Sequence, residues 1–246
     1  MKKIFTLMAI ASTLLFAWSC DKDDDDNGGK KEKEEKQENK QPVTIDGDFA
    51  DWAALNPTAY VSAKNNPNSP WEGVKEIRCF ADENFVYYYI KFNSETLKDA
   101  FDADTPAMHI RLCINTDGEY TTGYQNYFLQ GYDFIIEGSI VEEGAFVDFD
   151  GTLHQRYNDK WNELLLPGAN LVMGKGAGTE YEILLTRQVF NNAAAGSEVP
   201  MPMGNTIQTG IRFYWNGWDE FSNMPNSSID DVENGWGNLL EVTVAK

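Results

Sequence analysis

The sequence predicts an all-β protein built as a mostly antiparallel sandwich or barrel. Short β-prone runs are separated by frequent glycine and aspartate residues, which is typical of such folds. One run has the alternation of a half-buried strand, because Met108, Ile110, Leu112 and Ile114 are apolar and alternate with His109, Arg111, Cys113 and Asn115. No internal repeat and no alternation of strands with helices is visible, so a parallel sheet is not expected.

The expected regular elements begin near Trp71, because clusters of proline and asparagine keep the preceding chain in loops. Residues 74–81 and 85–92 are two β-prone runs that Asp82-Glu83-Asn84 joins, which indicates a hairpin. Ser94 is expected to cap a short helix that ends near Phe101. Later strands are expected at residues 132–136, 140–141, 145–149, 180–185, 207–215 and 239–244, with a second short helix at 187–195.

The folded part of the chain is strongly acidic. The 246 residues hold 20 Lys and Arg and 39 Asp and Glu, for a net charge of −19. The first forty residues contain 8 of the basic and 9 of the acidic side chains, so residues 41–246 carry 12 basic and 30 acidic side chains, a net charge of −18. Such a domain repels phosphate backbones, so nucleic acid is not expected as a partner. Neutral ligands and cations such as calcium stay open.

Residues 1–20 have the features of a secretory signal. Lys2 and Lys3 precede an apolar run at residues 4–18, and the run is too short for a membrane span. Its end, Ala17-Trp18-Ser19-Cys20, resembles the lipobox of bacterial lipoproteins. The resemblance implies that Cys20 is lipidated and anchors the protein to outer-membrane lipid. The alternative is an ordinary cleaved signal with an incidental cysteine.

Residues 21–42 are expected to form a disordered tether, and residues 43–246 one β-sandwich domain. The tether has acidic residues at 21–26 and mixed charge at 30–40, so it cannot bury apolar surface. An acidic cluster directly after the lipidated cysteine resembles the surface-export signal of lipoproteins in glycan-foraging Gram-negative anaerobes. The resemblance implies a location on the outer membrane, facing outward.

Three separate motifs follow one another along the chain: Ile45-Asp46-Gly47 with Asp51-Trp52, Glu76-Ile77-Arg78 with Asp82, Tyr87 and Ile90, and the turn Asn115-Thr116-Asp117-Gly118. In this order they resemble family 9 carbohydrate-binding modules and their DOMON-like relatives. Residues 181–183 and 210–214 with Asp219 are similar to the last strands of that family. The resemblance implies a β-sandwich of jelly-roll or immunoglobulin-like arrangement that holds sugars between aromatic rings, in some members with structural calcium. Trp52 is expected to close the edge of the core.

The end of the strand at 207–215 is the first candidate for a ligand site. Sugar rings need aromatic planes and polar side chains, and an inward-facing Ile211, Phe213 and Trp215 would turn the intervening side chains outward. The predicted oligo- or polysaccharide site consists of Trp218, Tyr214, Arg212, Asn216 and Asp219, with Trp71 in addition. Weaker candidates are Tyr124, Tyr127 and Trp161. The alternative is that these aromatic rings serve packing alone.

Asn115, Asp117 and Glu119 place oxygen atoms at alternate positions of a tight turn, as a calcium ion requires. The distant bidentate glutamate of an EF-hand is absent from the pattern, and Asp-Gly between two strands is also an ordinary hairpin turn. Calcium is therefore a candidate cofactor, with the plain turn as its alternative.

No catalytic residues are predicted, and the protein is not expected to be an enzyme. Many carboxylates are present, Asp148, Asp150, Glu137 and Glu182 among them, but none is singled out as a glycosidase pair. His109 and His154 have no nucleophile motif beside them. Two alternatives remain: an accessory lipoprotein without a sugar site that joins other uptake-system proteins, and a divergent glycoside hydrolase. The spacing of Cys79 and Cys113 does not decide whether they pair.

Overall fold

The computed structural model describes residues 41–104, 106–124, 131–157, 160–163, 172–188, 190, 203–226 and 239–245. Residues Gln41–Lys246 form one compact unit, which contains all of the described strands and the two helices α1 and α2. The signal, Cys20 and nearly all of the tether lie outside the described residues. Within the described part of the chain, no helix combines the length and the apolar character that a membrane span requires.

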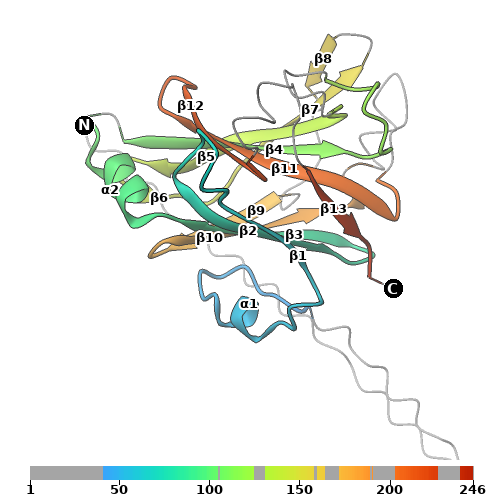
Figure 1. The fold of residues 1–246 in the computed structure, drawn as a ribbon, viewed down its shortest axis with the longest axis horizontal. Helices are drawn as coiled ribbons and strands as arrows, with labels where there is room; N and C mark the ends of the chain where they lie inside the picture. Colours follow the sequence, from blue (N-terminus) through green and yellow to red (C-terminus); the bar gives the residue numbers. More distant parts are fainter. Residues whose placement is uncertain are drawn as a thin grey trace, which may run out of the picture. The chain divides into compact units, whose positions relative to one another are not determined.

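The domain is a sandwich of two antiparallel sheets (Figure 1), as predicted. The five-stranded sheet has the order β1 (Val61–Lys64), β2 (Val74–Ala81), β3 (Phe85–Phe92), β10 (Glu180–Thr186) and β9 (Val172–Ala177). The eight-stranded sheet has the order β12 (Glu220–Met224), β11 (Thr206–Trp215), β4 (Ala107–Asn115), β5 (Phe134–Glu142), β7 (Thr152–Tyr157) and β8 (Lys160–Glu163). Two short strands join it, β13 (Leu240–Thr243) on β11 and β6 (Ala145–Phe146) on β5.

The core lies between the sheets and follows the predicted alternation. Met108, Ile110, Leu112 and Ile114 of β4 are all fully buried in it, and the residues between them face the other side of the sheet. The hairpin of β2 and β3 is confirmed with the expected bounds. Each strand of the eight-stranded sheet therefore sends every second side chain to an outer face.

Several local predictions differ from the structure. The two strands expected at 132–136 and 140–141 are one strand, β5, because Gly138 is a position of close approach and not a break. A Cβ atom at Gly138 would lie 2.9 Å from the Asp150 carbonyl oxygen. The strand expected at 145–149 is only β6. Most of the helix expected at 187–195 lies outside the described residues.

Both helices are short. Helix α2 spans Ser94–Asp102, and its cap position is Asn93 and not Ser94, with no side-chain capping bond. Helix α1 spans Ala50–Ala54, inside the stretch that was expected to form loops only, as is β1. At five residues α1 has too little periodicity to be visible in the sequence.

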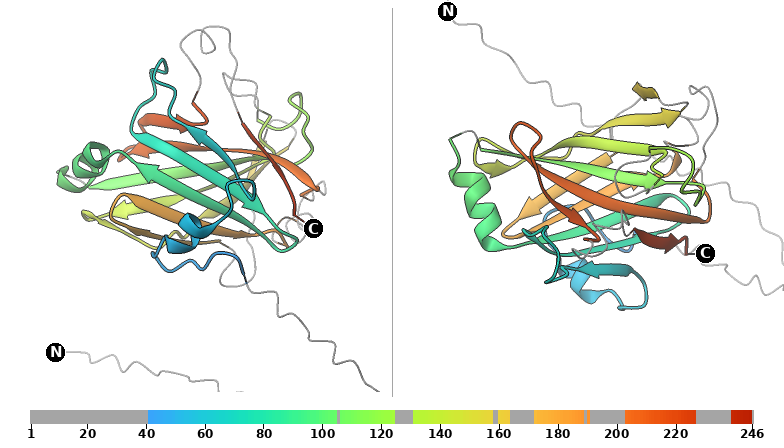
Figure 2. Two further views of the ribbon diagram at one scale, coloured as in Figure 1. Left: turned by 60° about the horizontal axis from the view of Figure 1, so that its bottom comes forward. Right: turned by 45° about the horizontal axis from the view of Figure 1, so that its top comes forward.

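The N-terminal segment covers the outer face of the five-stranded sheet, as the two views of Figure 2 show for the blue α1 region. Trp52 is 1% exposed and packs on Phe80 and Tyr89. Its Nε1 donates to Glu182 Oε2 over 3.1 Å, and the backbone amides of Asp46 and Gly47 donate to Oε1. Burial raises the pKa of Glu182, and these three hydrogen bonds oppose the shift. Trp52 is buried, but it does not close the edge of the core between the sheets as predicted. It belongs to a separate apolar cluster on the outer face of the five-stranded sheet, because the N-terminal segment folds over that face.

Candidate functional site on the outer face of the eight-stranded sheet

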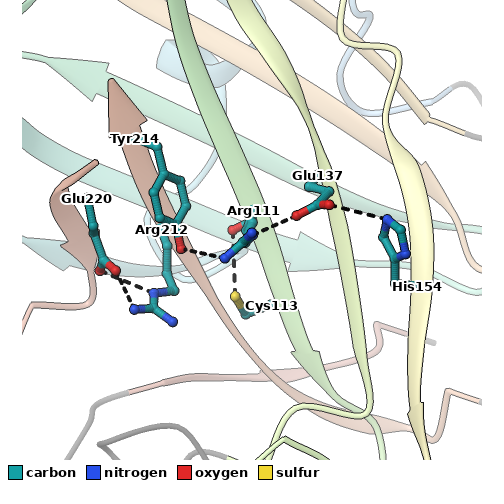
Figure 3. Close-up of polar contacts among 7 residues, drawn as sticks. All are labelled: Arg111, Cys113, Glu137, His154, Arg212, Tyr214 and Glu220. Atoms are coloured by element: carbon teal, nitrogen blue, oxygen red, sulfur yellow. Dashed lines mark hydrogen bonds and ion pairs between the residues drawn. The ribbon is translucent and has the colours of Figure 1, made fainter. Parts of the chain in front are cut away.

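A row of charged side chains crosses the outer face of the eight-stranded sheet. Arg111 of β4 is paired in register with Glu137 of β5 on one side and with Arg212 of β11 on the other. Because directly paired residues point to the same face, all three side chains lie together there, as Figure 3 shows. The sheet order thus places a pair of guanidinium groups side by side.

Hydrogen bonds hold Arg111 in a network. Its Nε donates to Glu137 Oε2 over 2.6 Å, and its Nη1 donates to the Tyr214 hydroxyl over 3.2 Å. Glu137 Oε1 lies 3.3 Å from His154 Nε2, so the network reaches β7. An arginine fixed at both ends in this way is pre-organised for a ligand.

Arg212 forms a second ion pair at the other end of the row. Its Nε donates to Glu220 Oε1 over 3.1 Å, its Nη2 contacts Glu220 Oε2, and both side chains are less than one-fifth exposed. Cys113 lies between the two arginines, and burial raises the pKa of its thiol to about 12. The thiol is therefore neutral and not a nucleophile at physiological pH.

Trp218 lies flat over this face. Its ring stacks on His109 with a centroid distance of 4.7 Å and an interplanar angle of 16°, and the Arg111 guanidinium lies 4.9 Å from the ring centroid. His109 and Arg111 both rise from the outer face of β4, so they cover one face of the indole. Trp218 is 42% exposed, so a large part of the ring remains open to solvent.

A tight turn between β11 and β12 presents this ring. The Trp218 amide donates to the Trp215 carbonyl over 3.0 Å, and the Trp215 amide donates to the Asp219 carbonyl over 2.8 Å. Trp218 has a φ of 68°, a left-handed conformation that costs about 1 kcal/mol or more in a residue other than glycine. An exposed tryptophan held in an unfavourable conformation is a feature that packing does not explain.

A hollow of about 270 Å³ adjoins this platform, and Arg111 contacts both. Its apolar part is the small cluster of Cys113, Tyr132 and Ile135, which Tyr124 joins. Its polar part consists of Arg111, Arg212, Glu137 and His154. An aromatic plane next to a mixed hollow with a few fixed polar groups is the composition of a small-ligand site.

The structure brings half of the predicted ligand residues together. Tyr214 lies 5.4 Å from Trp218 between ring centroids, and the Arg212 guanidinium lies 6.0 Å from the Tyr214 ring. Asn216 and Asp219 are exposed residues of the same turn. Trp71 is not part of this group, because its described contacts are with Ser69 and Asn226, beyond the far end of β12.

The weaker candidates divide in the same way. Tyr124 lines the hollow, where the Arg156 guanidinium lies 5.7 Å from its ring. Tyr127 and the side chain of Trp161 lie outside the described residues. Sequence patterns missed Arg111, Glu137 and His154 as members of the site. Only Arg111 lies on a predicted strand; Glu137 lies just outside the strand predicted at 132–136, and β7 with His154 was not predicted. Only the strand order β11-β4-β5-β7 shows that they are neighbours.

The turn that was predicted to hold calcium uses its own oxygens to close. Asn115 Oδ1 accepts from the Gly118 amide over 2.7 Å, and Asp117 Oδ1 accepts from the Glu119 amide over 2.8 Å. Asn115 Nδ2 donates to the Glu119 carbonyl, so it points a nitrogen into the turn. The described residues contain no group of three or more His, Cys, Asp or Glu side chains that could hold a metal ion. Calcium remains a prediction that this geometry does not support.

Cys79 and Cys113 are free thiols. Cys79 faces the core between the sheets, whereas Cys113 belongs to the cluster on the outer face, so the two side chains point into different layers. The carboxylates that a hydrolase would need are engaged separately. Glu182 is bonded to Trp52, Glu137 to Arg111, and Asp148 to Lys175.

Comparisons with known proteins give distant structural likeness only. No family model and no curated protein matches the sequence. A similar solved structure is a family 9 carbohydrate-binding module from Caldicellulosiruptor kristjanssonii in complex with glucose. It is 12% identical, the alignment covers 82% of this chain and 91% of the module, and the TM-score is 0.29. At this similarity the ligand of the module says nothing about this chain, so the case for a ligand rests on the geometry of the site.

Proposed function

We propose that this protein is a non-catalytic carbohydrate-binding lipoprotein whose sugar site is the outer face of the eight-stranded sheet around Trp218. The observation that carries the proposal is the Trp218 ring, which is supported from below by His109 and is open above. A pyranose ring has apolar C–H faces that stack on such a plane. Stacking also needs little adaptation by the protein, because the plane is already fixed.

The polar groups beside Trp218 complement the hydroxyl rim of a sugar. Arginine supplies several donors in a rigid fork, and Glu137 and the Tyr214 hydroxyl supply acceptors. All of these groups are held by one another, so a sugar meets donors and acceptors that lose little freedom on binding. The hollow of about 270 Å³ accommodates a ligand of small size, such as one sugar ring of a longer chain.

The proposed location follows from the N-terminal sequence. Lipidation of Cys20 and an acidic tether would hold the sandwich at the outward face of the outer membrane, where it would capture glycans for an uptake system. Radiolabelled palmitate should be incorporated into the wild-type protein and not into Cys20→Ser. Protease added to intact cells should release the domain; a protein that stays untouched until the cells are lysed contradicts the outward orientation.

The test of sugar binding uses residues 41–246, which contain both sheets and all of the described core. This domain should bind a subset of a glycan panel, and Trp218→Ala should weaken that binding by about 1–3 kcal/mol, by analogy with the stacking of bases on aromatic side chains. Tyr60→Ala is the matched control, because Tyr60 also lies beside an arginine but on the other sheet. Absence of binding together with co-purification with a transporter would favour an accessory subunit. Turnover of labelled oligosaccharides would instead establish a hydrolase.

A further inference from the structure

The two arginines of the site stand in an unusual relation to each other. Arg111 and Arg212 are directly opposed in the β4–β11 ladder and point to the same face. Like charges in directly opposed positions destabilise an antiparallel pair. The core-facing neighbours of both residues are apolar and well packed, so the fold itself gives no reason for two guanidinium groups here.

Two glutamates on opposite sides of this arginine pair partly neutralise its charge. Glu137 of β5 accepts a hydrogen bond from Arg111 Nε, and Glu220 of β12 accepts hydrogen bonds from Arg212 Nε and Nη2. The Tyr214 hydroxyl accepts a hydrogen bond from Arg111 Nη1. Among the described residues, Arg111 Nη2 and Arg212 Nη1 have no hydrogen-bond acceptor, and both side chains line the hollow.

The floor between the two arginines is formed by the neutral Cys113 thiol with Tyr132 and Ile135. No described hydrogen bond joins this floor to Arg111 Nη2 or Arg212 Nη1. The Cys113 thiol makes its own contact with the Arg111 carbonyl oxygen. Figure 3 shows the sulfur below the Arg111 guanidinium, with Arg212 beside it and the two glutamates on opposite sides of the arginine pair. The site thus presents N–H groups of two cations above a mostly apolar floor.

We propose that Arg111 and Arg212 together bind the acidic group, a carboxylate or a sulfate, of a charged sugar that stacks on Trp218. This proposal rests on the proposed function and names its ligand class. The guanidinium fork can donate two parallel N–H groups to a pair of oxygens of a carboxylate or of a tetrahedral oxyanion, and these hydrogen bonds are charge-assisted. The network that fixes Arg111 against Glu137 and Tyr214 would orient it for that contact.

The charge of the whole domain limits the ligand further. Residues 41–246 carry a net charge of −18, which repels a polyanionic chain before it reaches the site. A single acidic sugar in an otherwise neutral glycan meets much less of this repulsion. The expected ligand is therefore a neutral oligosaccharide with one isolated acidic residue, and not a polyuronate.

The experiment compares acidic oligosaccharides with their neutral counterparts on residues 41–246 by calorimetry. One set is 3′-sialyllactose, 3′-sulfated lactose and lactose; the other is a xylo-oligosaccharide with and without one glucuronic acid branch. At least one acidic ligand should bind about tenfold or more tightly than its neutral counterpart, the strength of a charge-assisted hydrogen bond. Carboxylate and sulfate are distinguished by which lactose derivative binds. Trigalacturonate should bind more weakly than the singly charged ligands.

Two variants should change this preference in opposite directions. Arg111→Gln should remove about tenfold of the affinity for the acidic ligand. Glu137→Gln keeps an acceptor for Arg111 but removes a competing negative charge, so it should increase that affinity. Both variants should retain the wild-type circular dichroism spectrum, because both side chains are partly exposed. Salt is a poor probe here, since it screens the attraction at the site and the repulsion of the domain together.

The outcomes separate the two proposals. Binding of acidic over neutral ligands that depends on Arg111 supports both. Equal binding of acidic and neutral members, with sensitivity to Trp218→Ala, overturns the acidic ligand and leaves the sugar site intact. Absence of binding to every sugar, acidic or neutral, overturns the sugar site and the acidic ligand together.

Discussion

The two outer faces of the sandwich contain the same chemical groups in different surroundings. On the five-stranded sheet, Arg78 is bonded to Glu76 and lies 5.0 Å from the Tyr60 ring. On the eight-stranded sheet, Arg111 is bonded to Glu137 and lies 4.9 Å from the Trp218 ring. Each face therefore combines an arginine, a glutamate and an aromatic ring.

The two outer faces differ in whether another segment of the chain covers them. The N-terminal segment lies over the five-stranded sheet and inserts Trp52, which is 1% exposed, into a cluster with Val43, Phe80 and Tyr87. No described segment covers Trp218, which is 42% exposed beside a hollow. The same residue types thus stabilise the fold on one face and remain available to a ligand on the other. Residue type alone therefore cannot identify a ligand site, because a site also needs a face that no other segment covers.

The largest expected effect is on stability at the covered face. Trp52→Ala should lower the free energy of unfolding by about 3–5 kcal/mol, because it leaves a cavity and removes a donor from Glu182. Urea denaturation followed by circular dichroism measures the change. The folded variant should bind glycans as the wild type does. Loss of glycan binding by the folded variant would indicate that the ligand binds at the five-stranded sheet and not at the eight-stranded sheet.

A smaller effect on stability is expected from Asp133, a buried carboxylate next to β5 of the eight-stranded sheet. Asp133 Oδ2 accepts from the Thr116 amide and hydroxyl, whereas no described residue contacts its buried Oδ1, and burial raises its pKa to about 6. Between pH about 4 and 6 the native state then holds more protons than the unfolded state. The contribution of Asp133 to the free energy of unfolding is therefore fully present below about pH 4 and is lost as the pH rises through about 6.

Asp133→Asn should therefore reduce this fall in stability between pH 4 and 6. The variant keeps an acceptor for Thr116, so it should match the wild type near pH 4 and exceed it at pH 7 by up to about 3 kcal/mol. Unfolding curves at pH 4, 5, 6 and 7 give the comparison. Parallel pH profiles for the two proteins would contradict the assignment.

The smallest effect on stability is expected at Trp218 itself. Asparagine tolerates the left-handed conformation better than tryptophan, so Trp218→Asn should change the unfolding free energy by only about 0.5 kcal/mol, in either direction. Thermal unfolding measures this difference, with Trp52→Ala as the contrasting variant. Destabilisation of several kcal/mol would show that Trp218 serves packing.

The sequence predicted local features on both faces, but not the contacts between distant strands. Alternation in β4, the β2–β3 hairpin and the burial of Trp52 depend on local patterns, which period and turn chemistry determine. Trp218, Tyr214 and Arg212 were predicted to lie together, and they do, because they lie within one hairpin. Their role in binding stays a prediction. Arg111 and Glu137 were not predicted as members of the site, since Arg111 joins Arg212 only through the pairing of strands about one hundred residues apart, and Glu137 joins Arg111 only through the β4–β5 register.

Two other differences have local physical causes. Gly138 resembles a strand break in the sequence, but it lies inside β5 where another backbone approaches too closely for a side chain. The turn at Asn115 and Asp117 has the composition of a cation loop, yet its oxygens accept backbone hydrogen bonds within the turn. The strand bounds around Gly138 thus depend on a tertiary contact, whereas the oxygens of the turn are occupied by local hydrogen bonds.

The most direct test compares one aromatic residue on each face by ligand binding. Calorimetry with the tightest glycan ligand should show that Trp218→Asn weakens binding by about 1–3 kcal/mol, whereas Tyr60→Ala leaves it unchanged. Both variants must first give the wild-type circular dichroism spectrum. Equal binding by Trp218→Asn and the wild type would contradict a sugar site on the open face.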